Sequence, residues 1–222
     1  MTSFAIKMIA AASMLIDHVG LIFFPGLPIL RILGRLAFPI YAFCIAQGFL
    51  HTRNRKRYFL QVFILGAVCQ LVYFLVDGSV YLGVLISFSI SIVLMWAVDR
   101  VKKAEKGRRL CPMLLLAGML AAAGALCSFV EVDYGFPGML LPVLLFAGED
   151  REKGLALFTA GLLLLCVNLG TLGGFQVQWY SLLTLPLLYL YNGQRGKYSL
   201  KYFFYIFYPA HLAALYLLDM VL

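Results

Sequence analysis

Charged residues are scarce in this 222-residue sequence, at 13% of positions against 63% for hydrophobic residues. Soluble domains contain about 25% charged residues, so the composition excludes a soluble globular protein, and the same apolar excess excludes intrinsic disorder. Acidic residues are fewer than basic ones, and the formal net charge is +8. Binding to nucleic acid would need these cations on an exposed face of a soluble fold, so no nucleic-acid partner is predicted.

The motifs of several soluble enzyme classes are also missing. The sequence has no Walker loop and no GxGxxG, GxSxG or HExxH segment. Its five cysteines are scattered without a CxxC pair, and its three histidines do not cluster. We therefore predict no metal site and no disulfide framework.

Long apolar runs make up most of the chain. A helix needs about 20 mostly apolar residues to cross the hydrocarbon core of a bilayer, so the chain is long enough for about nine spans. The polar breaks place the spans near 5–23, 29–50, 58–76, 80–98, 111–130, 136–147, 154–169, 176–191 and 200–220. These runs predict an all-α, polytopic transmembrane helical bundle, with 1–222 as a single integral-membrane domain.

Two of these spans are short, 136–147 and 154–169, and the first also contains two prolines. We expect one of the two to be re-entrant or strongly tilted.

The cationic residues indicate the orientation of the bundle. Apart from Lys7, Arg31 and Arg35, all Lys and Arg residues lie in alternate loops, near 51–57, 99–110, 148–154 and 192–201. Lys and Arg are retained on the cytoplasmic side of short loops. The N-terminus is therefore predicted to be cytoplasmic and, with nine spans, the C-terminus to be outside. The predicted location is the bacterial cytoplasmic membrane, with the lipid bilayer as a partner.

A few ionisable residues lie inside the predicted spans, where each costs a few kcal/mol on insertion scales and usually faces the bundle interior. They are Lys7, Asp17, His18, Arg31, Arg35 and His211. The connection FFPGLP is short enough to make the first two spans an antiparallel hairpin. Asp17, His18, Arg31 and Arg35 are therefore expected at similar depth in the outer half of the membrane.

Helical spacing indicates which of these side chains can meet. Arg31 and Arg35 share one helix face, whereas Asp17 and His18 point about 100° apart. Asp17 is expected to pair with one arginine, which leaves the second guanidinium and the imidazole to attract an anion. In the alternative interpretation, Asp17 only locks the hairpin and the arginines extend to the outer surface.

His211 lies in the last span, three residues after Tyr208 and so on nearly the same face. Pro209 lies between them and deprives a backbone carbonyl of its helical partner, and such a broken turn can line a polar cavity. Ordinary packing of a Tyr and a His on an aromatic helix is the alternative.

Three segments carry a family resemblance: MIAAASMLIDHVGLIFFP, LRILGRLAFPIYAFCIAQGFLHTRNRKRY and KYFFYIFYPAHLAALYLL. In order and spacing they resemble the TraX family of bacterial membrane proteins, and the resemblance covers nearly the whole chain. The family is named for a conjugation protein that acetylates the amino terminus of pilin, and it is similar to integral-membrane acyltransferases. The resemblance implies acetyl-CoA as cosubstrate and a protein amino terminus, glycan or lipid as acyl acceptor. Gln47 stands where many relatives have an acidic residue, and we assign it no catalytic role.

The resemblance and the charge pattern together suggest a mechanism. His18 is expected to be the general base, with Asp17 positioning an arginine. The substrate-binding residues are expected to be Arg31, Arg35, Tyr208 and His211. The phosphates of acetyl-CoA are expected to meet the cytoplasmic cations Arg53 and Arg57, with Lys7 on the route to His18.

Two other functions remain open. A small transporter or flippase for an anionic solute or lipid would also use Arg31 and Arg35 as its binding site. A membrane scaffold without catalytic activity would use the same cluster only to fix helix packing.

Overall fold

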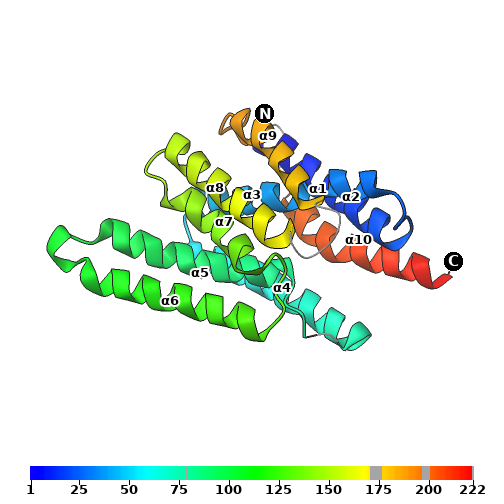
Figure 1. The fold of residues 1–222 in the computed structure, drawn as a ribbon, viewed down its shortest axis with the longest axis horizontal. Coiled ribbons are helices and arrows are strands. Elements are labelled where there is room, and N and C mark those ends of the chain that lie inside the picture. The colour runs from blue at the N-terminus through cyan, green and yellow to red at the C-terminus, as the bar shows by residue number, and fades with distance from the viewer. Residues whose placement is uncertain (79, 171–176, 197–200, 222) are drawn as a thin grey trace. The chain divides into compact units, whose positions relative to one another are not determined.

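The computed structural model describes residues 1–222 except 79, 171–176, 197–200 and 222. Over these residues the regular structure is helical, apart from one isolated bridge (Figure 1). The α-helices are α1 (Ser3–Ile22), α2 (Pro28–Gly34), α3 (Ala37–His51), α4 (Arg55–Asp77), α5 (Val84–Lys103), α6 (Leu110–Phe129), α7 (Gly135–Ala147), α8 (Arg151–Gly170), α9 (Thr184–Tyr189) and α10 (Lys201–Val221). Two 3₁₀ helices, η1 (Lys106–Arg108) and η2 (Val177–Leu183), complete the order.

The chain forms two compact units. The first contains 1–44 and 162–222, and the second contains 45–161, so that α3 and α8 each contribute residues to both. The two units are described separately below.

The prediction of an all-α, polytopic bundle is confirmed. Six helical segments among the described residues are long and apolar enough to cross a membrane, namely α1, α2 with α3, α4, α5, α6 and α8. The prediction of nine spans is compatible with these six and the shorter apolar helices. Helix α7, with 13 residues and Pro142 in its interior, is short as predicted.

Helix α8 is longer than the predicted run 154–169. It has 20 residues because it begins at Arg151, inside the polar segment. Its length therefore gives no reason to treat it as re-entrant.

The predicted span 176–191 is also wrong as a single membrane helix. Of its described residues, Val177–Leu183 form η2 and only Thr184–Tyr189 form an α-helix. Pro186 explains the division, because proline is tolerated in the first turn of an α-helix but disrupts its interior. Several predicted positions lie outside the described residues. They are residue 176, residue 200 at the start of the last predicted span, Lys197, and residues 171–175 of the predicted loop 170–175.

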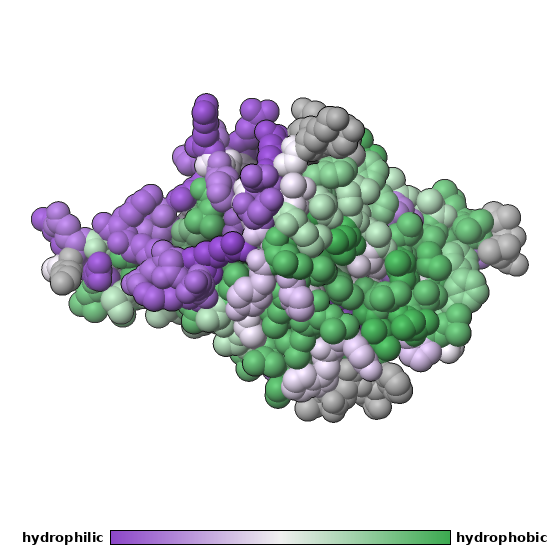
Figure 2. Space-filling view, turned by 90° about the horizontal axis from the view of Figure 1, so that it is seen from above, coloured by the Kyte–Doolittle hydropathy of each residue, from purple (hydrophilic) through white to green (hydrophobic). Residues whose placement is uncertain are grey.

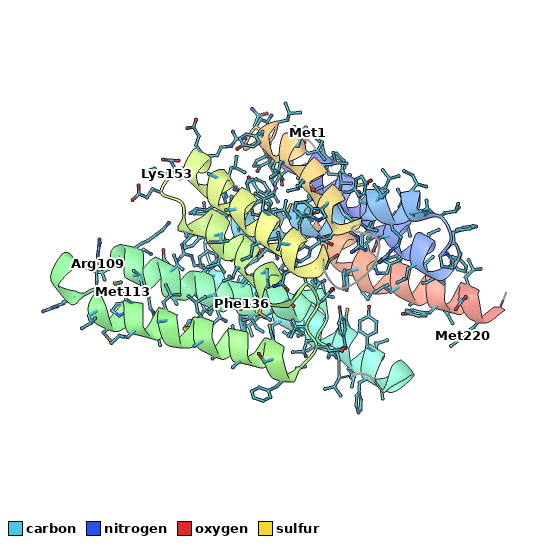
Figure 3. The ribbon with its side chains drawn as sticks, viewed as in Figure 1. Met1, Arg109, Met113, Phe136, Lys153 and Met220 are labelled. Atoms are coloured by element: carbon cyan, nitrogen blue, oxygen red, sulfur yellow. The ribbon has the colours of Figure 1, made fainter. Side chains whose placement is uncertain are left out.

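The first unit is built on the α1–α2 hairpin, with α10 packed against α1 and η2 against α2 (Figure 1). The start of α1 is tied to the segment after α9. The Met1 amine donates to the Leu190 carbonyl, and the Ser3 N–H donates to the Gln194 carbonyl at 2.7 Å. Met1 and the end of α9 lie side by side in Figure 3. The N-terminus and the loop around Arg195 therefore share one side, as the charge alternation predicts.

The second unit is built on α5, which packs against α4, α6 and α7. At one end Leu82 and Val132 form the isolated bridge, so the connection between α4 and α5 meets the connection between α6 and α7. At the other end Lys102 Nζ donates to the Gly148 carbonyl at 3.0 Å and to the Phe146 carbonyl at 2.6 Å. The loops that the charge pattern assigns to one side thus meet each other within this unit.

Figure 3 illustrates the two ends of the second unit. Arg109, at the α5–α6 turn, lies far from Phe136, at the start of α7. Arg55 of α4 pairs with Asp99 of α5 at 2.6 Å, which places the loop before α4 at the same end as Arg109.

Large apolar side chains remain exposed along the long helices. Leu75 of α4 is 72% exposed and Leu110 of α6 is 70% exposed. Hydrophobic residues also cover wide areas of the face drawn in Figure 2. Such surfaces are unfavourable in water and favourable against lipid chains, so the chain is a multi-pass membrane protein.

Candidate functional site

Two glycines bring the helices of the α1–α2 hairpin into close contact. A Cβ atom at Gly20 would lie 2.6 Å from Leu30 Cβ, and one at Gly34 would overlap the Asp17 carboxylate. Separations this small are not tolerated, so any larger residue would push the helices apart. Gly34 therefore allows the Asp17 carboxylate to lie directly against α2. The sequence analysis did not predict this role. The position of Gly34 between Arg31 and Arg35 was the signal that could have indicated it.

Asp17 binds both arginines. Arg31 Nη1 lies 2.8 Å from Asp17 Oδ2, and Arg35 Nη2 lies 2.8 Å from Oδ1 and 2.9 Å from Oδ2. We call this set the Asp17 triad. The expectation that Asp17 would pair with one arginine and leave the other unbalanced is corrected, because the i, i+4 spacing sets both guanidinium groups over one carboxylate.

The Asp17 triad is largely enclosed by protein. The side chains of Asp17, Arg31 and Arg35 are 15%, 28% and 14% exposed. One carboxylate against two guanidinium groups leaves a formal charge of +1, because arginine does not deprotonate in proteins. A net positive charge enclosed by protein favours a negative charge that develops nearby.

Arg35 lies at an interruption of the second span. Helix α2 ends at Gly34 and α3 begins at Ala37. Pro39 explains the break, because its ring lacks an N–H and clashes with the carbonyl four residues earlier, which is that of Arg35. The proline thus separates the arginine pair from the rest of the span.

The His18 ring packs against His211 of α10, on a different face of α1 from Asp17, as the angular spacing predicts. Its ring centroid is 5.1 Å from that of His211, with the rings nearly perpendicular. His18 Nδ1 lies 2.8 Å from the Met14 carbonyl, and His211 Nδ1 lies 2.7 Å from the Phe207 carbonyl. A carbonyl only accepts, so each Nδ1 donates, and in the neutral rings each Nε2 holds the basic lone pair.

The last helix brings His211 next to His18. His211 is 6% exposed, and its Nε2 has no hydrogen-bond partner among the described residues. The ring of Tyr208 lies edge-on to that of His211 with centroids 6.0 Å apart. Buried polar atoms are normally bonded, so an imidazole nitrogen of this kind is a candidate contact for a ligand.

The sequence reasoning also missed Gln178. This residue of η2 is 7% exposed, and its Oε1 accepts from Arg35 Nη1 at 3.5 Å. A glutamine in an apolar run gives a weak signal, and its approach to Arg35 depends on the 3₁₀ turn that the span prediction did not anticipate.

Comparisons with known proteins identify the family of this chain. The family model described as "TraX protein" matches residues 3–219. The chain belongs to the TraX family. It is 28% identical to "Protein TraX" of Escherichia coli over 95% of this chain and 84% of that protein. It is 26% identical to "Probable fimbrial assembly protein FimC, serogroup H1" of Dichelobacter nodosus over 96% of this chain and 94% of that protein. No solved structure matches the chain.

In this TraX-family chain the remaining predicted site residues are Lys7 of the first unit and Arg53 and Arg57 of the second unit. Lys7 is half-buried on α1, about 16 Å before His18 at 1.5 Å per residue. Arg53 and Arg57 are exposed residues of the second unit. Asn54 caps α4, and its Oδ1 accepts from the Arg57 backbone N–H at 2.9 Å. Their part in binding acetyl-CoA stays a prediction.

Two further predictions concern Gln47 and metal binding. Gln47 lies on α3 in the second unit, where its carbonyl accepts from His51 Nδ1 at 2.8 Å. No group of three or more His, Cys, Asp or Glu residues within the described part of this TraX-family chain is arranged to hold a metal ion.

Proposed function

We propose that this protein is a membrane acyltransferase that moves an acetyl group from cytoplasmic acetyl-CoA to an amine or hydroxyl acceptor, with His18 as the general base. One observation carries the proposal: an imidazole with its Nδ1 bonded to a carbonyl stands next in sequence to a triad with an excess positive charge. A base and a cationic group are the two elements that acyl transfer from a thioester requires.

In the proposed reaction the acceptor nitrogen or oxygen attacks the carbonyl carbon of the thioester. His18 Nε2 takes the proton of the acceptor, and the carbonyl oxygen becomes an oxyanion that the nearby guanidinium groups stabilise. When the oxyanion collapses, the C–S bond breaks and the thiolate leaves. The imidazolium returns the proton to the thiolate, so the products are the acetylated acceptor and CoA.

Asp17 has a positioning role in this scheme. Both of its carboxylate oxygens accept from Arg35 Nη2, which holds that guanidinium group beside the carboxylate. Because Arg31 is held by the same carboxylate, the excess charge of the Asp17 triad is kept at one place. Fixed charges of this kind stabilise a transition state without reorganising during the reaction.

The acceptor is a protein amino terminus, a glycan or a lipid. One relative is named as a probable fimbrial assembly protein, which supports an acceptor that is a subunit of a surface fibre. The location of the family in membranes supports an acceptor that is reached at or beyond the bilayer.

The test uses the purified protein in lipid nanodiscs with radiolabelled acetyl-CoA. Candidate acceptors of the three classes are added separately, and the transfer of label and the release of CoA are measured. Transfer to one class that depends on His18 supports the proposal. Absence of transfer and of CoA release with all three classes would overturn it.

A second candidate function is transport of an anionic solute or lipid. The interruption of the second span at Arg35 favours it, because discontinuous membrane helices form the substrate sites of many transporters. Uptake of a labelled anion into proteoliposomes without acetyl-CoA, lost on substitution of Arg35, would favour transport over acyl transfer.

A further inference from the structure

We propose that a buried row of polar side chains on η2 and α9 binds the amide-bearing arm of the thioester donor, with Gln178 donating to the acyl carbonyl oxygen. This inference rests on the proposed acyltransferase function. The row consists of Gln178, Ser181 and Thr184, which are 7%, 0% and 0% exposed. The side chains of a 3₁₀ helix eclipse every three residues, so Gln178 and Ser181 of η2 share one face. Thr184, the first residue of α9, follows at the same spacing.

The orientation of the Gln178 amide is set by Arg35. Because Arg35 Nη1 can only donate, the atom that faces it is Oε1, and the amide nitrogen points elsewhere. Gln178 Nε2 is buried and has no hydrogen-bond partner among the described residues. A buried N–H group beside a guanidinium is suited to a carbonyl oxygen that becomes negative during reaction.

The other end of the row also has an unsatisfied group. Thr184 Oγ1 is buried without a hydrogen-bond partner in the described part of the chain. Between the two, Ser181 Oγ lies 3.4 Å from Cys166 Sγ, and Cys166 Sγ donates to the Gln178 carbonyl at 3.4 Å. Thus the centre of the row is anchored to α8, while its two ends offer hydrogen bonds to a ligand.

The direction of the row fits a donor that arrives from the cytoplasm. From Gln178, beside Arg35, the chain runs through Thr184 to Leu190, whose carbonyl binds the Met1 amine. The row covers about 12 Å at about 2.0 Å per residue, and it leads from the Asp17 triad toward the N-terminal end of α1. The arm of CoA carries amide groups along its length and ends in the thioester, so its hydrogen-bonding groups match a row of this kind.

The experiment compares two ligands and two variants in nanodiscs. Acetyl-CoA contains the arm, and adenosine 3′,5′-bisphosphate contains the nucleotide without it. Thr184→Val should weaken acetyl-CoA binding by about tenfold and leave adenosine 3′,5′-bisphosphate binding unchanged. Gln178→Leu should lower kcat by about a hundredfold, because the donor to the oxyanion is lost.

Matched variants separate binding from folding. Thr184→Ser keeps the hydroxyl and should retain wild-type affinity for acetyl-CoA. Thr159→Val makes the same change at a threonine whose hydroxyl already donates to the Leu155 carbonyl at 2.8 Å. It should leave the affinity for both ligands unchanged. If Gln178→Leu does not fold by gel filtration and thermal unfolding, Gln178→Met provides the same measurement.

The outcomes distinguish the two proposals. Wild-type protein that neither binds acetyl-CoA nor transfers the acetyl group would overturn the acyltransferase function itself. Wild-type turnover with unchanged affinity and kcat in the variants would overturn only the assignment of the row. Equal weakening of acetyl-CoA and adenosine 3′,5′-bisphosphate by Thr184→Val would also exclude the row as the site of the arm.

Discussion

Each unit of this protein contains one aspartate that binds two cations, and the two clusters differ in their surroundings. They are Asp17 with Arg31 and Arg35 in the first unit, and Asp99 with Arg55 and Lys103 in the second. The carboxylates are similarly enclosed, at 15% and 17% exposed. The second cations differ widely, since Arg35 is 14% exposed and Lys103 is 71% exposed.

The comparison shows that burial of the carboxylate alone does not identify a functional site. Asp99 and Lys103 lie near the end of α5, where basic loops are predicted to meet lipid head groups. Around the Asp17 triad the neighbouring elements add Gln178 and His211, both with buried polar atoms that have no partner among the described residues. These buried polar atoms without a partner, rather than the ion pair, identify the first unit as the candidate site.

The largest effect is expected from His18→Ala. Removal of the general base should lower acetyl transfer by at least about a hundredfold, measured with labelled acetyl-CoA in nanodiscs. His51→Ala is the matched control, because His51 also donates from Nδ1 to the carbonyl four residues earlier, at 2.8 Å, but lies in the second unit. Equal losses in the two variants, or unchanged turnover in His18→Ala, would remove His18 from the mechanism.

The next effect is on stability and compares the two aspartates directly. Asp17→Asn removes the counter-charge of two enclosed guanidinium groups, and we expect the free energy of unfolding to fall by about 3 kcal/mol. Asp99→Asn should lower the free energy of unfolding by about 1 kcal/mol or less, because the exposed Lys103 side chain can turn toward water or head groups. Reversible unfolding in mixed micelles measures both, and a larger loss for Asp99→Asn would contradict the contrast between the clusters.

A smaller effect is expected from Gly34→Ala. The added methyl group overlaps the Asp17 carboxylate, so the hairpin must shift, with a loss of about 1–3 kcal/mol and a matching loss of acetyl transfer. Gly118→Ala in α6 is the control, because nothing lies within 4 Å of its Cβ position. That variant should be neutral or up to about 1 kcal/mol more stable. Wild-type activity in Gly34→Ala would mean that close approach of α2 to Asp17 is not required.

Local sequence predicted that Asp17 would meet the arginines of the second span, but not that both would bind it. The turn between the first two spans is short, and Arg31 and Arg35 are four residues apart, so the hairpin determines which side chains can meet. The separation of His18 from Asp17 also follows from the angle between adjacent helical residues. The charge pattern likewise predicted which loops share an end of each unit.

The polar row on η2 could not be predicted in the same way. An apolar run with one glutamine is compatible with an α-helix, in which positions 178, 181 and 184 drift apart around the axis. Only the 3₁₀ geometry before Pro186 brings Gln178 and Ser181 onto one face. The contact of Gln178 with Arg35 joins residues 143 positions apart, and no local pattern reports such a pair.

The smallest effect is expected from Lys103→Ala. Its ammonium group lies 2.8 Å from Asp99 Oδ2, but Arg55 Nη1 binds the same oxygen at 2.6 Å and continues to compensate the carboxylate. Loss of an exposed i, i+4 pair should change the free energy of unfolding by less than about 0.5 kcal/mol and leave acetyl transfer unchanged. Arg35→Ala is the corresponding change in the Asp17 triad and should reduce transfer strongly. Similar outcomes for the two variants would show that the clusters are equivalent, and the first unit would then lose its claim to the active site.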